Sequence, residues 1–394
     1  MPHPAPLSVV ALSLVLTLGA CGGSASSPST PSSTTPTDTT NPVSGAWVMG
    51  YAVGYERDLL PPSELNWASL THLAVGRATP NADGSLNTTF DIDAVGGPAW
   101  AKSMVQQAHA HNVKALLMLG GAGEHAGFVG AASAGKRQVF VQNILTLVQD
   151  YGFDGVDLDW EPVASADDAP LKALAVSLKA AKPDLLLTVP VNFVNSNFPA
   201  DEARPSYADL AQTVDRLNIM SYGMAGVYEG WKSWHSSALM GESDSTPSSV
   251  DSSVKAYLAA GVPASKLGLG IGFYGLCYQG VLGPNQNAAG MKIAADDGQM
   301  SYTTLMSGYF TPAARKWDAA AKVPYLSSAT PLGTDKCTFV SYEDAQSIAE
   351  KGRYAREKGL GGTIIWTLGQ AHFGNKPAGQ RDPLLDAVKA AFRP

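Results

Sequence analysis

Short apolar runs alternate along the chain with segments whose apolar residues recur at helical spacing. The runs are typical of buried strands, and eight of them lie at residues 47–53, 70–78, 113–121, 156–161, 185–192, 216–223, 267–275 and 361–369. Amphipathic stretches such as 136–152 and 342–359 precede the strands that follow them. Strands that alternate with helices predict a parallel sheet, and eight such units predict a (β/α)8 TIM barrel of class α/β.

The spacing between the last two predicted strands is too long for one helix. Residues 276–338 are therefore expected to form a small α+β insertion between strands 7 and 8, beside the barrel mouth. A doubly wound open sheet is the alternative architecture. The first strand is not followed by the glycine fingerprint of dinucleotide binding, and the glycines at 268–272 lie inside a strand pattern, so we favour the barrel.

The first 44 residues depart from this pattern. Residues 7–20 form an apolar run that is too short to span a bilayer, and it leads into LGAC at 18–21. This tetrapeptide resembles the bacterial lipoprotein signal, in which Cys21 becomes the lipidated first residue of the mature chain. Residues 22–44 are mostly Ser, Thr, Pro and Gly, a composition typical of a flexible tether.

These features predict a signal peptide over 1–20, a linker over 21–44 and a folded barrel over 45–394. We expect the protein to be exported and lipid-anchored to the bacterial cell envelope, with membrane contact through the anchor only. The alternative is an ordinary secretory signal, which would make the protein a secreted one.

Composition and charge narrow the possible functions. The 394-residue chain has a formal net charge of −7 and 45% hydrophobic residues, which suits a globular protein with a large core. An acidic balance argues against nucleic-acid binding, which needs clustered Lys and Arg. His109 and His111 lie on different faces of a predicted helix, unlike the i, i+4 pairs that bind metals. We expect a monomer with no metal and no cofactor.

Residues 156–161, VDLDWE, alternate apolar and acidic side chains. Successive side chains of a strand point to opposite faces, so Asp157, Asp159 and Glu161 share one face. Like charges packed together cost free energy unless partners or a reaction use them. Active sites of barrels lie at the carboxyl ends of the strands, and this places Glu161 at the predicted site.

The acids of this strand also match a known pattern. Asp-x-x-Asp-x-Asp-x-Glu resembles strand four of glycoside hydrolase family 18, the chitinase family. The four places are filled by Asp154, Asp157, Asp159 and Glu161. The resemblance covers nearly all of residues 46–394, since VDRLNIMSYG at 214–223 is similar to the family's strand six and GGTIIWTLG at 361–369 to its strand eight.

The resemblance implies a role for each matching residue. Glu161 would donate a proton to the glycosidic oxygen and later act as base, and Asp159 would orient the acetamido group of the substrate. Tyr222 would hydrogen-bond the acetamido oxygen, and Asp157 would share a proton with Asp159. Trp366 would form the floor under the sugar. Further contacts with the substrate are expected from Tyr51, Arg77, Asp154 and Met220.

The implied activity is hydrolysis of β-1,4 linkages in N-acetylglucosamine polymers, chitin or chito-oligosaccharides, by a substrate-assisted retaining mechanism. In that mechanism the substrate's own acetamido oxygen attacks the anomeric carbon, so the substrate must be N-acetylated. Two alternatives stay open: hydrolysis of peptidoglycan or another N-acetylhexosamine glycan, and non-catalytic binding of chitin. The presence of Glu161 argues against the non-catalytic alternative.

Several positions depart from the family pattern, and they are Arg77, Met118, Gly223 and Leu276. Arg77 is either a solvated charge on the barrel rim or a contact for an acidic sugar substituent. Gly223 stands where an Asp usually follows Tyr222. The missing charge predicts that Glu161 loses its proton at lower pH than in relatives that have the Asp. The alternative is that Gly223 serves a backbone conformation with positive φ.

Cys277 and Cys337 flank the predicted insertion in a chain expected to be exported, where disulfides persist. We predict that they are bonded to each other, with Cys21 left over because it is acylated. The alternative is a pair of free buried thiols.

Overall fold

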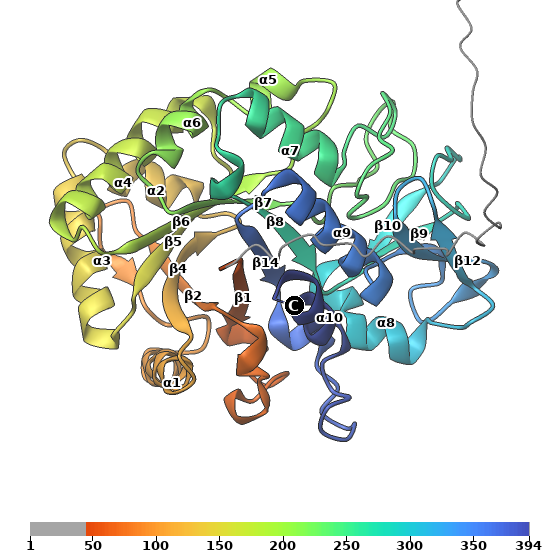
Figure 1. Ribbon diagram of the computed structural model, residues 1–394, viewed down its shortest axis with the longest axis horizontal. Helices are drawn as coiled ribbons and strands as arrows, with labels where there is room; N and C mark the ends of the chain where they lie inside the picture. Colours follow the sequence, from red (N-terminus) through yellow and green to blue (C-terminus); the bar gives the residue numbers. More distant parts are fainter. Residues whose placement is uncertain (1–44, 394) are drawn as a thin grey trace, which may run out of the picture. The chain divides into compact units, whose positions relative to one another are not determined.

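The computed structural model describes residues 45–393 of the chain. Within that range, parallel strands close into a barrel, because the last strand pairs with the first. In order around the barrel they are β1 (Trp47–Val53), β2 (His72–Pro80), β4 (Lys114–Gly121), β5 (Gly155–Trp160), β6 (Leu186–Asn192), β7 (Arg216–Met220), β8 (Leu267–Gly272) and β14 (Gly362–Trp366). The predicted (β/α)8 barrel is confirmed (Figure 1). A short strand β3 (Leu86–Asn87) pairs with the end of β2.

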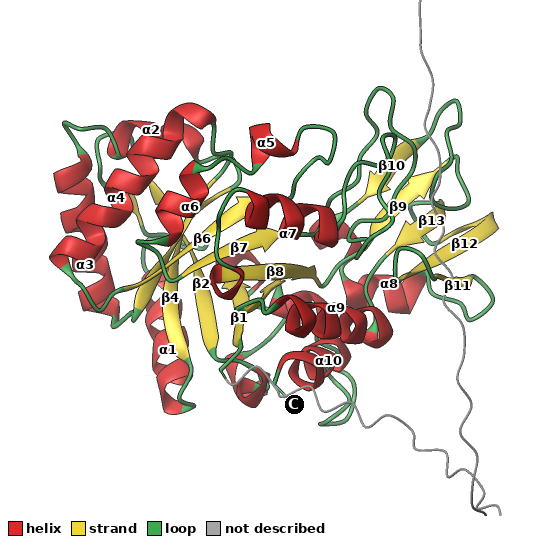
Figure 2. Cartoon of the chain, turned by 45° about the horizontal axis from the view of Figure 1, so that its top comes forward, coloured by secondary structure: helices red, strands yellow, loops and turns green. Residues whose placement is uncertain are grey.

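Helices surround the barrel on its outer side (Figures 1 and 2). They are α1 (Gly96–Ala110), α2 (His125–Ala131), α3 (Arg137–Tyr151), α4 (Asp168–Ala181), α5 (Pro199–Glu202), α6 (Ser206–Ala211), α7 (Val250–Ala259), α9 (Ala345–Lys358) and α10 (Pro383–Phe392). Helical spacing of apolar residues explains their packing, since α3 buries Phe140, Ile144 and Leu147 on one side. The connection from β1 to β2 contains short 3-10 turns in place of an α-helix.

Helix α9 has sharply defined ends. The side chain of Asp344 accepts hydrogen bonds from the backbone N–H groups of Gln346 at 2.9 Å and Ser347 at 3.0 Å, which satisfies donors of the first turn. At the other end Gly359 adopts a left-handed conformation with φ of 66°. These caps fix the position from which Lys351 projects into the interior.

The segment between β8 and α9 forms a second, antiparallel sheet beside the barrel (Figure 2). Its strands lie in the order β10-β9-β13-β12-β11. The elements of this insertion (residues 276–341) are β9 (Leu276–Gln279), β10 (Lys292–Ala295), α8 (Tyr302–Gly308), β11 (Arg315–Asp318), β12 (Val323–Leu332) and β13 (Cys337–Ser341). The α+β insertion predicted over 276–338 is confirmed, and its last strand continues to Ser341.

Side chains at alternate positions of the strands divide between the barrel interior and the helix layer. Met49 and Tyr51 of β1 pack inside the barrel with Met118 of β4, whereas Val48 joins the core between strands and helices. The same alternation along β5 sends its acidic residues inward and its apolar residues to the helix layer.

The predictions for the amino-terminal residues, a signal peptide over 1–20, lipidation at Cys21 and a linker to residue 44, lie outside the described residues. Among residues 45–393, no helix combines the length and apolar character needed to span a bilayer.

A disulfide joins Cys277 in β9 to Cys337 in β13, as predicted. We expect the variant Cys277→Ala/Cys337→Ala to lose about 4 kcal/mol of unfolding free energy, because a crosslink across 60 residues restricts the unfolded chain. Denaturant unfolding of the two proteins measures the loss. Mass spectrometry of unreduced peptides supplies the direct check, and two free thiols in the wild-type protein would contradict the assignment.

Candidate active site

Three carboxyl side chains, two in β5 and one directly after it, point into the barrel. Asp157 is completely buried, Asp159 is 3% exposed and Glu161 is half-buried. Each lies one strand repeat beyond the previous one, so the three form a column. This acid column leads from the barrel interior to the carboxyl end of β5, where barrel active sites lie.

Asp157 at the inner end of the column has two hydroxyl partners. The Tyr51 hydroxyl on β1 donates to Oδ2 at 2.7 Å, and the Thr188 hydroxyl on β6 donates to Oδ1. Burial raises the pKa of Asp157 to about 6, the two hydrogen bonds oppose that rise, and the charge of Glu161 adds to it. Asp157 therefore keeps a proton over a pH range in which a solvated Asp has already lost it.

The outer two acids are coupled to each other. Burial raises the pKa of Asp159 well above its usual range, and the charges of Glu161 and Asp157 raise it further. Burial also raises the pKa of Glu161. A hydrogen bond between the two carboxyls favours the proton on Asp159 and lowers the pKa of Glu161. Among the described residues Asp159 Oδ1 has no hydrogen-bond partner, so it is a free acceptor.

A pocket with about 510 Å³ of empty volume opens at the outer end of the acid column. Its lining combines carboxyl groups with aromatic rings, which suits a sugar with polar substituents on an apolar ring face. The lining residues are Tyr51, Ala122, Asp159, Glu161, Pro190, Met220, Tyr222, Tyr274, Asp297 and Trp366. In residues 45–393 no group of three or more His, Cys, Asp or Glu is placed to hold a metal ion.

The pocket therefore brings together most of the residues predicted from the sequence. It also contains two that sequence reasoning missed, Tyr274 and Asp297. Asp297 comes from the insertion, and its carboxylate accepts from Trp366 Nε1 at 3.1 and 3.2 Å and from Gln370 Nε2 at 2.8 Å. Tyr274 follows β8 at the carboxyl end of the barrel. Its position at the end of a predicted strand could have indicated a residue of the active site. Asp297 had no such signal, because it begins a short 3-10 helix of the insertion, and no local pattern shows that this helix faces the barrel mouth.

The prediction that Asp154 contacts the substrate is wrong. Asp154 precedes β5, so it lies at the amino end of the strand, opposite to Glu161. Its carboxylate accepts from Lys114 Nζ at 2.7 Å and from the backbone N–H of Ala115 at 2.9 Å, and it pairs with His109 Nε2 at 2.8 Å. These contacts assign Asp154 to the structure of the barrel base.

Arg77 lies at the rim and does not line the pocket. Its guanidinium pairs with Asp91 at 3.0 Å and with Glu124 at 3.3 Å. Because both partners neutralise it, Arg77 has no unpaired charge for an acidic sugar substituent. Its positive charge lowers the pKa of Asp159 and of Glu161, against the larger effect of burial.

Two residues that depart from the family pattern, Met118 and Leu276, are buried and contribute to packing. Met118 is buried in the barrel interior, and a Cβ at Gly76 would lie 2.5 Å from its sulfur, so the glycine makes room for the methionine. Leu276 is buried in the core of the insertion with Tyr278 and Phe339, and it does not reach the pocket.

Gly223 is explained by its backbone. Its φ of 61° lies in the left-handed region that favours glycine, and a Cβ there would lie 3.1 Å from the Tyr274 hydroxyl. The structure therefore supports the backbone alternative for this residue. The hypothesis that the missing charge lowers the pKa of Glu161 relative to relatives with an Asp stays a prediction.

The account of Asp157 predicts an unusual pH dependence of stability. Its folded-state pKa of about 6 exceeds the unfolded value of about 3.9, so its contribution to stability is fully present below pH 3.9 and is lost as the pH rises through 6. Asp157→Asn removes this titration. The unfolding free energy of the variant relative to wild type should therefore be about 2 kcal/mol higher at pH 8 than at pH 4.

Asp154→Asn is the matched control at the other end of β5. Burial raises the pKa of Asp154, but its hydrogen bonds from Lys114, Ala115 and His109 outweigh burial and lower the pKa. The ionised form therefore stabilises the folded protein, and this contribution is lost as the pH falls through the folded-state pKa. Relative to wild type, this variant should be less stable at pH 8 than at pH 4. The same pH trend in both variants would contradict the account of Asp157.

Comparisons with known proteins identify relatives of this chain. Among curated relatives, Chitinase A1 of Niallia circulans is 31% identical over 60% of this chain and 38% of its own length. Chitinase 1 of Aphanocladium album is 28% identical over 77% of this chain and 76% of its own. The alignment thus spans less than half of Chitinase A1 and about three quarters of Chitinase 1.

A solved structure and a family model also match this chain. The crystal structure of Ostrinia furnacalis Group IV chitinase in complex with allosamidin is 26% identical to this chain, with a TM-score of 0.72. The similarity covers 88% of this chain and 99% of that one. Residues 48–371 match the family model "Glycosyl hydrolases family 18", a range that includes the barrel strands from the second residue of β1 to the end of β14 and the whole acid column. The chain belongs to glycoside hydrolase family 18.

Proposed function

We propose that the protein is a glycosidase that cleaves β-1,4 linkages in chitin or chito-oligosaccharides by a substrate-assisted retaining mechanism. The observation that carries the proposal is the acid column, which keeps protons and opens into a pocket beside Tyr222 and Trp366. A protonated carboxyl at the pocket supplies a general acid, and aromatic rings bind sugar faces. The family and the chitinase relatives support an N-acetylated substrate.

In the first step Glu161 donates its proton to the glycosidic oxygen, while the substrate's acetamido oxygen attacks the anomeric carbon. The bond to the leaving sugar breaks and a cyclic oxazolinium ion forms. Asp159 accepts the acetamido N–H through its free Oδ1, and Tyr222 donates to the acetamido oxygen. Above pH 6 Asp157 is ionised, so it takes up the proton that Asp159 releases as the oxazolinium charge develops, and it returns this proton to Asp159 when the oxazolinium ring opens.

In the second step the Glu161 carboxylate accepts a proton from water, and the oxygen of that water attacks the anomeric carbon. The oxazolinium ring opens and the acetamido group is restored. The anomeric carbon has then been inverted twice, so the product keeps the β configuration. Glu161 ends the cycle with the proton it needs for the next one.

Besides Glu161, the pocket contains two carboxyl groups that a conventional glycosidase could use as nucleophile. Asp159 is a poor nucleophile because burial and the neighbouring charges keep it protonated. The other candidate is Asp297. Its oxygens are engaged by the Trp366 indole and by Gln370, which hold the carboxylate against the residue proposed as the sugar floor. This leaves the acetamido group of the substrate as the nucleophile.

A glycan with an acidic substituent, such as peptidoglycan, is the alternative substrate. Arg77 was the candidate contact for its carboxylate, but Arg77 is already paired with two acids. The pocket lining contains Asp and Glu and, among the described residues, neither Lys nor Arg. Repulsion between like charges therefore favours the neutral glycan.

Glu161→Gln should keep the fold and the binding of chito-oligosaccharides while hydrolysis falls by about 10³-fold. An amide cannot donate the proton, and general acid catalysis contributes ~10²–10⁴-fold. Turnover of N-acetylglucosamine oligomers measures the loss, and calorimetric titration of the variant with the same oligomers measures binding. A variant that keeps its turnover would refute the site assignment.

A deacetylated oligomer of the same length is the control substrate for the wild-type enzyme. It has no acetamido oxygen to attack the anomeric carbon, so we expect a loss of turnover of about the same size. Equal turnover of the acetylated and deacetylated oligomers would rule out the substrate-assisted mechanism and leave the acid role of Glu161 standing.

We further propose that the enzyme is exported and works as a monomer tethered to the cell envelope through acylated Cys21. The support is the LGAC sequence at 18–21 followed by the Ser/Thr/Pro-rich segment. Metabolic labelling with a palmitate analogue in a bacterial host should label the wild-type protein and leave Cys21→Ala unlabelled. A labelled variant or an unlabelled wild-type protein would contradict the anchor.

A further inference from the structure

Tyr222 follows β7, and the peptide groups on both sides of it are held by two adjacent serines. The carbonyl oxygen of Ser221 accepts a hydrogen bond from the Ser237 hydroxyl. The N–H of Gly223 donates to the Ser236 hydroxyl at 3.1 Å. Both serines are 4% exposed, so these bonds are protected from water. The backbone around Tyr222 is therefore fixed from the loop that follows it.

Each serine is fixed in turn by another part of the chain. The backbone N–H of Ser236 donates to Ser341 Oγ at 2.9 Å, in the last strand of the insertion. Ser237 Oγ accepts from Lys351 Nζ at 2.6 Å, in α9. Ser221 is itself locked to β8, because its hydroxyl accepts from the N–H of Gly270 at 2.8 Å and donates to the carbonyl of Gly270 at 3.0 Å.

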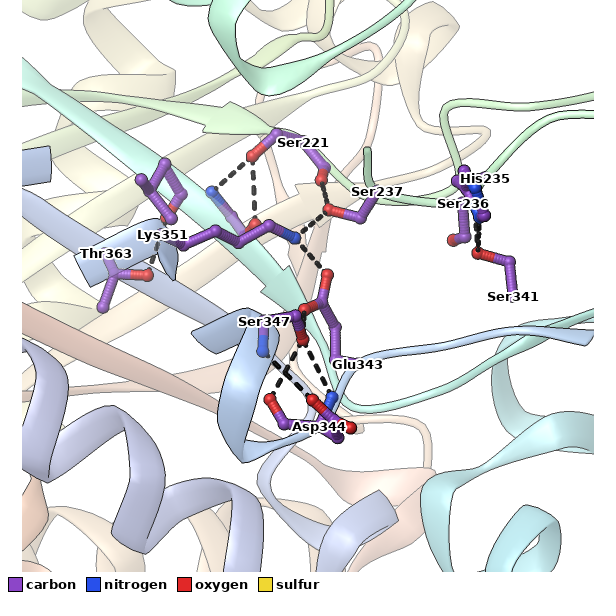
Figure 3. Close-up of polar contacts among 12 residues, drawn as sticks. Ser221, His235, Ser236, Ser237, Ser341, Glu343, Asp344, Ser347, Lys351 and Thr363 are labelled. Atoms are coloured by element: carbon purple, nitrogen blue, oxygen red, sulfur yellow. Dashed lines mark hydrogen bonds and ion pairs between the residues drawn. The ribbon is translucent and has the colours of Figure 1, made fainter. Parts of the chain in front are cut away.

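Lys351 is completely buried, and its charge is neutralised by Glu343, which lies two residues after the insertion. The second oxygen of Glu343 accepts from the Ser347 hydroxyl at 2.6 Å. Figure 3 shows the resulting chain of contacts from Glu343 through Lys351 and Ser237 to Ser221. Every member is buried, so the chain is a fixed polar path through the core.

The ion pair has a directional effect on Ser237. A buried ion pair often stabilises a fold no more than apolar side chains of similar volume would. Stability alone therefore does not explain why Lys351 and Glu343 are buried together. An ammonium group has only donors, whereas a serine hydroxyl has one donor and two acceptor sites. Because Lys351 occupies an acceptor site of Ser237, the serine's hydrogen points to the Ser221 carbonyl.

We propose that Lys351 and Glu343 act through Ser237 as positioning residues for Tyr222. The inference rests on the proposed function, in which the Tyr222 hydroxyl donates to the acetamido oxygen as it attacks the anomeric carbon. That bond strengthens as charge develops, so a displaced Tyr222 lowers kcat more than it changes KM. Through this pair, α9 and the segment after the insertion help to position the Tyr222 side chain.

Ser237→Ala removes the donor to Ser221 and tests the proposal. We expect kcat on an N-acetylglucosamine oligomer to fall about tenfold, with KM within about twofold of wild type. Ser253→Ala is the matched control, because the Ser253 hydroxyl is also fully buried and donates to a backbone carbonyl, Ser249 O at 2.8 Å, at the start of α7 in the helix layer. It should keep kcat within about twofold. Equal losses in the two variants would overturn the proposal.

A double-mutant cycle with Tyr222→Phe separates positioning from general loosening. If Ser237 acts through the Tyr222 hydroxyl, Ser237→Ala costs no further activity in the Tyr222→Phe background. The same tenfold loss in both backgrounds would overturn the proposal and leave the proposed function intact. Full activity of Tyr222→Phe would refute the role of Tyr222 itself.

Lys351→Met/Glu343→Gln is a second route to the same test. It removes both charges together, and the introduced glutamine would keep an acceptor for Ser347, so no lone buried charge remains. The cycle with Tyr222→Phe should give the same result as Ser237→Ala. Failure of both this variant and Ser237→Ala to fold, shown by near-UV circular dichroism, would make the network a structural one and overturn the proposal.

Discussion

Burial of three carboxyl groups on one face of one strand is the constraint on which the rest of the site depends. A carboxylate taken out of water must keep its proton or find donors. Asp157 finds its donors on β6, which pairs with β5, and on β1, whose Tyr51 reaches it across the interior of the closed barrel. Asp159 keeps its proton because burial and the charges of Glu161 and Asp157 all disfavour its ionised form. The closed barrel interior buries these carboxyl groups, and this burial keeps an acid protonated at the pocket.

The insertion completes the site that the barrel begins. Asp297 comes from it and holds the Trp366 indole, and Glu343 lies two residues after its last strand and neutralises Lys351. The disulfide between β9 and β13 ties together the sheet from which both acids extend. A barrel strand thus provides the acids, while the insertion and α9 fix the aromatic side chains that face them.

The sequence predicted the parts of the molecule that depend on periodicity. Alternation along a strand decides which side chains share a face, so the acid column and the strand order followed from it. The error at Asp154 has a geometric origin: seven residues of extended chain separate it from Glu161, roughly 20 Å, which is the length of a barrel strand. A motif gives the spacing of acids along the chain and does not say which end of the strand each one reaches.

Other features depend on contacts that no local pattern carries. Thr188 becomes a partner of Asp157 only when β6 lies beside β5. Asp297 acts from a short 3-10 helix and Ser237 from a turn, both far along the chain from the residues they contact. Gly223 was ambiguous for a related reason, since a glycine permits a positive φ without requiring it. The roles of such residues depend on neighbours that only the folded chain brings together. These residues complete a site whose first members, the acids of β5, the strand pattern already indicates.

Double displacement at the anomeric carbon is the central chemical claim, and the configuration of the first product reports on it directly. Proton NMR recorded during the first minutes of chito-oligosaccharide hydrolysis distinguishes the anomers of the new reducing end before they equilibrate. A substrate-assisted reaction through an oxazolinium ion predicts that the β-anomer appears first. Initial formation of the α-anomer would mean a single displacement by water and would contradict the assignment of Glu161, Asp159 and Tyr222 to that mechanism.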